Sequence, residues 1–213
     1  ARLDERGWIV TSNVDDAVRA LHEGKQVELL HVREVATLLD RLAAIAMAAE
    51  ERGEQAPIYD LCKVSVKGTN LFCADALDID RAQMPQFLGF AKPGSEADKL
   101  PKRPRGTVDI APAFQEHLRS RGYTIAETME SAAFLRASQR QLNGAKVGQM
   151  MGWLRDKQKD PYGNYHPPLL VSEDNYIIDG HHRWAAMVGL DAEDGRFGDV
   201  LMPIVRVNIR IIP

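Results

Sequence analysis

The chain has 213 residues, 45% hydrophobic and 27% charged, with a formal net charge of −3 at pH 7. It is long enough to bury a core as one domain or two small ones, and its composition is that of an ordinary globular protein. The slightly acidic balance excludes a global positive field that would draw the chain to DNA or to an anionic membrane. No apolar run approaches the roughly 18 residues needed to span a bilayer.

The N-terminal residues and the cysteines bear on targeting and redox state. Residues 1–6 do not have the pattern of a signal peptide, so we expect a cytoplasmic protein. The missing initiating Met weakly favours a fragment of a longer chain. Cys62 and Cys73 are too few for a disulfide framework and lack metal-site spacing, so we expect buried free thiols or a single incidental pair.

Residues 1–125 are predicted to form a mainly helical extension that includes a β-hairpin. Residues 14–23 and 32–52 have helical periodicity, and the apolar side chains of the second segment fall on one face. Gly53 is placed to end that helix, because glycine is common just past a helix C-terminus.

Beyond residue 58 the apolar period shortens to that of a strand. Residues 58–66 alternate, and a turn at 68–70 leads to a second short run, which predicts the hairpin. Asp75, Asp78 and Asp80 lack the pattern of a calcium loop and predict a solvated turn. Residues 91–108 are rich in Pro and Gly, as in an exposed linker, and a helix from Pro112 to Arg121 follows, stopped by Gly122.

Residues 126–213 are predicted to form a separate domain. A strand, or the exit from one, over 134–139 precedes a helix of about 13 residues that starts at Asn143, and a hairpin follows over 168–178. Lys146 lies in the first turn of the helix, where a cation opposes the helix dipole, so it needs an anionic partner unless it is simply solvated. The loop 160–166 carries two tyrosines, which could stack on a nucleobase or lie on the surface.

The most informative stretch is Asp-Gly-His-His-Arg at residues 179–183. It follows an apolar run and opens a segment with helical periodicity, which predicts a strand, a glycine turn and a helix start. Such a turn aims backbone N–H groups and the positive end of the helix dipole at one point, which suits an anion. Two imidazoles and a guanidinium add donors that match phosphate.

This stretch resembles the signature of the ParB/sulfiredoxin-like superfamily, and the similarity extends through 137–139, 144–147, 168–172 and 202–207. The resemblance covers roughly residues 130–213. It implies an α/β (α+β) fold, with a mixed sheet flanked by helices, and a bound nucleotide such as ATP, ADP or CTP with Mg²⁺. The residues it assigns to nucleotide and phosphate binding are Ser138, Gln139, Lys146, Gly180, His182 and Arg183.

Asp179, His181 and His182 are the candidate catalytic residues. Asp179 could cap the helix, orient a histidine or hold Mg²⁺ beside a phosphate. His181 occupies the position of the sulfiredoxin cysteine, which excludes sulfinic-acid reduction. A chromosome-partitioning clamp is not expected, because the family's Glu-Arg is His181-His182 here and no helix-turn-helix follows. Glu127 and Glu130 are the nearest carboxylates upstream that could act as a general base.

Several functions remain open on these residues. The first is a nucleotide-dependent hydrolase or phosphotransferase. The second is a DNA- or RNA-binding nuclease, which draws on the basic residues Arg136, Arg140, Lys146, Arg155, Lys157 and Lys159. The third is an effector domain of the phage head-associated or polymorphic-toxin type, delivered to a target cell's cytoplasm and covered by an immunity protein. The fourth is a non-catalytic nucleotide-sensing module.

Overall fold

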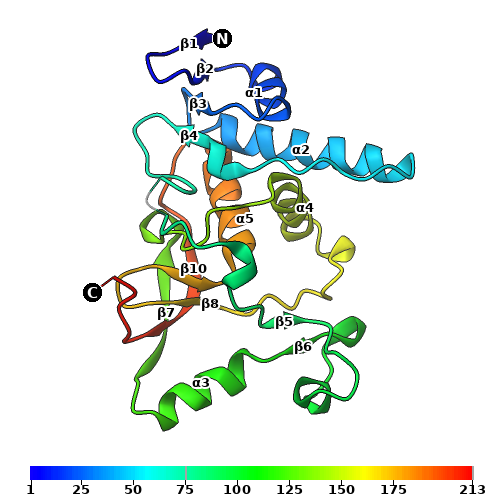
Figure 1. Cartoon of the computed structure of the whole chain (residues 1–213), viewed down its shortest axis with the longest axis vertical. Helices are drawn as coiled ribbons and strands as arrows, with labels where there is room; N and C mark the ends of the chain where they lie inside the picture. The colour runs from blue at the N-terminus through cyan, green and yellow to red at the C-terminus, as the bar shows by residue number, and fades with distance from the viewer. Residues whose placement is uncertain (75, 213) are drawn as a thin grey trace.

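Two four-stranded sheets and a group of packed helices organise the part of the chain that the computed structural model describes, residues 1–74 and 76–212. Figure 1 shows the first sheet and α2 at one end of the molecule and the second sheet at the other, with α5 between them. The fold is therefore mixed α/β, as expected. None of its described helices combines the length and apolar character that crossing a membrane requires.

The first sheet belongs to the N-terminal segment and has the order β1-β2-β3-β4. Strands β2, β3 and β4 run parallel, joined by the predicted helices, and β1 pairs antiparallel at the edge. The segment therefore contains a four-stranded sheet beside its predicted helices, and this sheet was missed because its strands are only two or three residues long and leave little periodicity in the sequence. The elements are β1 (Arg2–Leu3), β2 (Ile9–Thr11), α1 (Val14–His22), β3 (Val27–Leu29), α2 (Glu34–Glu51) and β4 (Val64–Val66).

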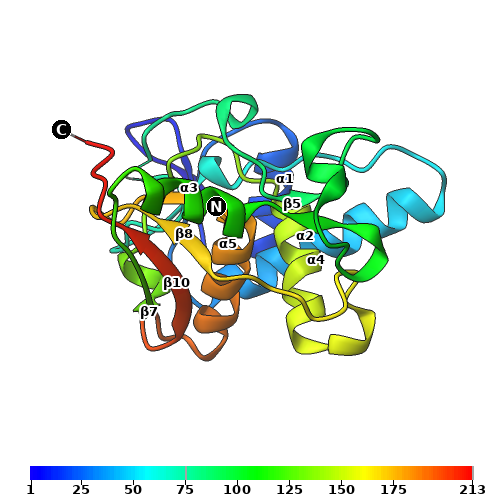
Figure 2. The same ribbon diagram turned by 90° about the horizontal axis from the view of Figure 1, so that it is seen from below.

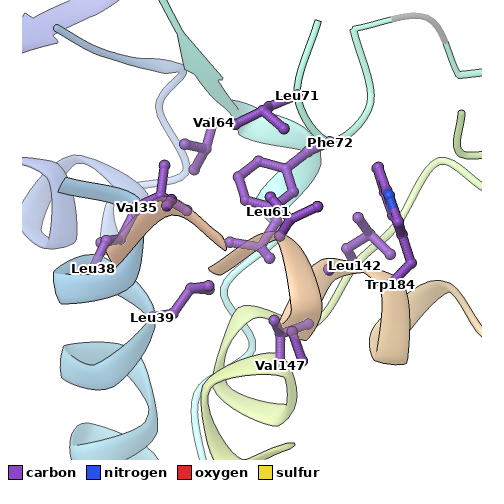
Figure 3. Packing of buried hydrophobic residues seen from close by; sticks show 14 of the residues in the cluster. Val35, Leu38, Leu39, Leu61, Val64, Leu71, Phe72, Leu142, Val147 and Trp184 are labelled. Atoms are coloured by element: carbon purple, nitrogen blue, oxygen red, sulfur yellow. The ribbon is translucent and has the colours of Figure 1, made fainter. Parts of the chain in front are cut away.

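The predicted hairpin after residue 58 is wrong. Only Val64–Val66 of this stretch is a strand, and it pairs in parallel with β3. The Asp60 carboxylate accepts the Cys62 N–H and starts a 3-10 turn instead of a longer strand. The run at 71–73 forms turns, places Phe72 in the core (Figure 3), and is tied back by a disulfide between Cys62 and Cys73. The second of the two alternatives for the cysteines, a single pair, is the one observed.

The second sheet has the order β7-β10-β8-β9. Strand β10 pairs antiparallel with β7 and parallel with β8, and β8 and β9 form the predicted hairpin. Seen from below in Figure 2, α5 lies between this sheet and α4. The bounds are β7 (Ile125–Ser131), α4 (Gly144–Arg155), β8 (Leu169–Val171), β9 (Ile177–Asp179), α5 (His181–Asp191) and β10 (Leu201–Val207).

Residues 134–139 do not form a strand but follow one, the second of the two alternatives; the strand is β7 and ends at Ser131. Residues 134–139 contribute single bridges only, at Arg136 and Gln139. Four consecutive residues of β7, from Ala126 to Met129, are exposed, so this edge strand has no apolar alternation by which the sequence could reveal it.

A second, smaller core lies on the other face of this sheet. Helix α3 (Ala111–Ser120), close to its predicted bounds, places Leu118 against Leu170 and Val205 of β8 and β10. Phe87 joins this cluster from the segment just before the short pair β5 (Leu88–Gly89) and β6 (Val108–Asp109). The segment that contains residues 81–90 is thereby anchored beside the second sheet.

The main core is shared by residues on both sides of position 125. Val35, Leu38 and Leu39 of α2 belong to one buried cluster with Val147 of α4 and Trp184 of α5 (Figure 3). Helices α2 and α4 approach closely at Gly148, where an added Cβ would lie 2.1 Å from the Leu39 carbonyl oxygen. The predicted boundary between 1–125 and 126–213 therefore crosses a continuous core.

Candidate anion site

The strand, turn and helix predicted at residues 177–184 are confirmed. Strand β9 ends at Asp179, Gly180 adopts φ +102°, and α5 begins at His181. Two observations exclude a side chain at Gly180. L residues rarely adopt this φ, and a Cβ would lie 2.3 Å from Leu169 Cδ2. No side chain caps α5, so the predicted capping role of Asp179 is wrong. The helix N-terminus is left open to a ligand.

An open pocket with an enclosed volume of about 80 Å³ lies at this turn. Its lining includes three cationic side chains, Arg81, Lys146 and Arg183, which come from distant parts of the chain. Asp179 is the carboxylate that faces them among the described lining residues. The charge balance of the pocket is therefore positive within a slightly acidic protein.

Lys146 and Arg81 are half-buried and have no ion-pair partner among the described residues. Burial, followed by the charge of Arg81, lowers the pKa of Lys146. Two cations that share a partly desolvated space repel each other, and an anion between them removes that cost. The prediction that Lys146 needs an anionic partner is consistent with this geometry.

Arg183 lies in the first turn of α5 and pairs with Asp179 across 3.4 Å. Burial raises the pKa of Asp179, and the nearby Arg183 guanidinium opposes that shift without cancelling it. The Arg183 Nε is buried and has no hydrogen-bond partner among the described residues. A loose ion pair and an unused donor leave the guanidinium able to bind a second anion.

His181 is a buried support for the neighbouring loop. Its Nε2 accepts the backbone N–H of Ser138 at 3.0 Å and that of Gln139 at 3.4 Å. Burial, followed by the charges of Arg81 and Arg183, lowers its pKa to about 3. Its accepting nitrogen is occupied, so the geometry does not favour His181 as the catalytic base.

His182 points to a different part of the same loop. Its Nε2 accepts the Asn143 N–H at 3.3 Å and lies 3.4 Å from the Arg81 guanidinium. Burial and the charges of Lys146 and Arg81 lower its pKa to about 3. Adjacent helical residues point about 100° apart, so the two imidazoles cannot share one role. Both side chains are buried.

Ser138 and Gln139 support the site more than they line it. The Ser138 hydroxyl donates to the Ile177 carbonyl, which joins the loop to β9, and it does not face the pocket. Gln139 lines the pocket, and its amide donates to the Gln141 carbonyl at 2.6 Å. The Asn143 side chain accepts the Lys146 N–H and caps α4, which fixes the start of that helix beside His182.

Sequence reasoning missed the segment 81–88 and left two alternatives open for the 160–166 loop. Arg81, Met84 and Phe87 line the pocket from a stretch without helical or strand periodicity. Tyr162 and Tyr165 are half-buried in its wall, and Tyr165 donates to Asp109 at 2.7 Å. The two tyrosines indicated a possible binding loop, but their position in the pocket wall depends on contacts with residues distant in the sequence, such as Asp109.

Other candidate residues lie outside this pocket. Glu127 is exposed on β7, and Glu130 pairs with Arg206, so neither is placed to act as a base there. The basic run does not form one free face: Arg140 pairs with Asp78 and Asp80, Arg155 with Asp40 and Glu193, and Lys159 with Asp156. Asp75, the third member of the acidic turn, lies outside the described residues.

No family model, no curated protein and no solved structure matches this chain.

Proposed function

We propose that this protein binds a nucleoside polyphosphate at the pocket beside Gly180 and hydrolyses or transfers its terminal phosphoryl group. The observation that carries the proposal is the convergence of Arg81, Lys146 and Arg183 at an uncapped helix N-terminus. Guanidinium groups bind phosphate through paired N–H groups, and the helix dipole favours the same charge.

The nucleotide part of the proposal rests on the lining of the pocket. The Tyr162 ring is held against Trp153 with centroids 6.0 Å apart, so an aromatic face is fixed beside the cations. Aromatic faces stack on nucleobases irrespective of sequence. The ring therefore does not choose among ATP, ADP and CTP, the candidates that the resemblance implies. The similarity of residues 179–183 to the ParB/sulfiredoxin-like signature supports the same proposal.

Mg²⁺ is proposed to enter with the nucleotide. The described residues contain no group of three or more acidic, histidine or cysteine side chains that would hold a metal without it. Mg²⁺ is commonly held by one carboxylate together with substrate phosphates. Asp179 is the carboxylate that could serve, if phosphate replaces it as the partner of Arg183.

Calorimetric titration of ATP, ADP, CTP and GTP, with and without Mg²⁺, tests the proposal. Arg183→Ala should abolish binding, whereas Lys146→Ala should weaken it by about 1.5–3 kcal/mol, or roughly 10- to 150-fold. The matched control is Arg196→Ala, which removes an exposed guanidinium that does not line the pocket. Equal affinity of wild type and Arg183→Ala would refute the site assignment. Failure of wild type to bind any of the four nucleotides would refute the proposed function.

A further inference from the structure

A third pocket histidine, His166, is held by a buried carboxylate. Asp160 is 3% exposed, and its Oδ1 accepts the Tyr162 N–H at 2.8 Å. Its Oδ2 accepts the Asn164 N–H at 2.9 Å and lies 2.6 Å from His166 Nε2. The carboxylate is thus fixed by the turn that it closes, and it orients the imidazole with little freedom.

This contact determines the tautomer of neutral His166. An ionised carboxylate can only accept, so Nε2 carries the proton and Nδ1 carries the lone pair. Among the described residues, nothing hydrogen-bonds to that Nδ1. His181 and His182 differ, because each uses its Nε2 lone pair to accept a backbone N–H.

His166 belongs to the same pocket as the residues proposed to hold phosphate. It lines the anion pocket together with Lys146 and Arg183, and its side chain is 27% exposed. His166 and Arg183 also both line an adjoining apolar hollow, so both lie at the boundary between the two. A ligand phosphate held by Arg183 would therefore share this pocket with the imidazole.

We infer that His166, oriented by Asp160, is the general base that activates water for attack on the terminal phosphoryl group. The inference rests on the proposed nucleotide function and deepens it. His166 Nδ1 takes a proton from water as the water oxygen forms a bond to the γ-phosphorus. The bond from that phosphorus to the bridging oxygen breaks, and its electron pair leaves with the nucleoside diphosphate. Asp160 stabilises the imidazolium until the proton passes to solvent.

Phosphate release from ATP and CTP with Mg²⁺, measured beside calorimetric affinity, tests the inference. His166→Gln should lower kcat by about 10²- to 10⁴-fold, the usual contribution of a positioned base, while the dissociation constant stays within twofold of wild type. Asp160→Asn should also lower kcat, because it misorients the imidazole; since Asp160 also accepts the Tyr162 N–H, this variant tests the orienting role through kcat alone. His117→Gln, an exposed change on α3, is the matched control and should leave both values unchanged.

Chemical rescue guards against a folding artefact. His166→Ala should bind nucleotide as wild type does and should recover part of its turnover when imidazole is added to the buffer. Turnover of His166→Gln equal to wild type would overturn the inference, as would nucleotide binding by wild type with no phosphate release. Absence of nucleotide binding by wild type is a different result, because it overturns the proposed function on which the base depends.

Discussion

At the residue scale, the three histidines of the pocket have different roles because their hydrogen-bond partners differ. His181 and His182 are buried and accept backbone N–H groups from residues 138–143, so they hold the pocket wall. His166 is partly exposed and donates to a buried carboxylate. The adjacent pair is conspicuous in the sequence, whereas His166 lies in a turn-rich loop. Which of the three has a lone pair without a hydrogen-bond partner among the described residues depends on tertiary contacts that no motif records.

The buried histidines predict a loss of stability in acid. Their folded pKa values, about 3, lie below the ordinary value of 6.5, so between these limits the unfolded chain binds protons that the folded protein does not. The free energy of unfolding should therefore fall as pH drops below 6.5, by on the order of 2–4 kcal/mol at pH 5 relative to pH 7.5. Urea unfolding at both pH values measures this.

His182→Gln supplies the control for that pH dependence. Glutamine can still accept the Asn143 N–H through its amide oxygen but does not titrate, so about half of the acid loss should disappear. Imidazole NMR resonances that show either histidine protonated in the folded protein at pH 5 would contradict the prediction.

At the scale of elements, long segments with a buried face were predictable and short or edge segments were not. The helices α1, α2, α4 and α5 combine an apolar face with recognisable ends, as Asn13 and Asn143 show by capping α1 and α4. Strands of two or three residues, as in the first sheet, are too short to show a period. The hairpin prediction failed because pairing in a sheet is chosen between distant segments, here β4 and β3.

The disulfide between Cys62 and Cys73 predicts a measurable contribution to stability. It closes a loop of 11 residues that places Phe72 in the main core. Replacing both cysteines by serine should lower the free energy of unfolding by about 2–3 kcal/mol, because the unfolded chain gains conformational freedom. Urea denaturation under non-reducing conditions measures this, and wild type with dithiothreitol should show a similar loss. An unchanged midpoint in both experiments would argue against a bond in solution.

The same bond bears on where the protein works. Disulfides persist mainly in oxidising compartments, so this pair stands against the cytoplasmic expectation drawn from the N-terminal residues.

At the scale of the whole molecule, the site depends on both segments of the chain. Arg81 comes from residues 1–125, whereas Lys146 and Arg183 come from residues 126–213. The main core is likewise shared, with α2 packed against α4. The resemblance extends only from about residue 130, so it could indicate the glycine turn but not the N-terminal arginine that completes the pocket.

This shared core predicts that residues 126–213 do not fold alone. Without α2, the apolar faces of α4 and α5 would be exposed, and the remaining chain would lose much of its buried area. Circular dichroism and amide NMR of the isolated segment should show an unfolded or loosely collapsed chain, with the full-length protein as the reference. A cooperative unfolding transition of the isolated segment would contradict this and would restore the two-domain interpretation.

By itself, the sequence determined the major helices, the β8–β9 hairpin and the glycine turn before α5. Each of these is specified locally, by apolar periodicity, by a capping residue or by a backbone conformation that glycine adopts readily. The tertiary structure alone decided the pairing of the short strands, the burial of His181 and His182, and the approach of Arg81 and His166 to the same pocket. The physical reason is that hydrogen bonds, desolvation and charge act across space between residues up to about one hundred positions apart, as between Arg81 and His182. Local residue patterns contain no information on such distances.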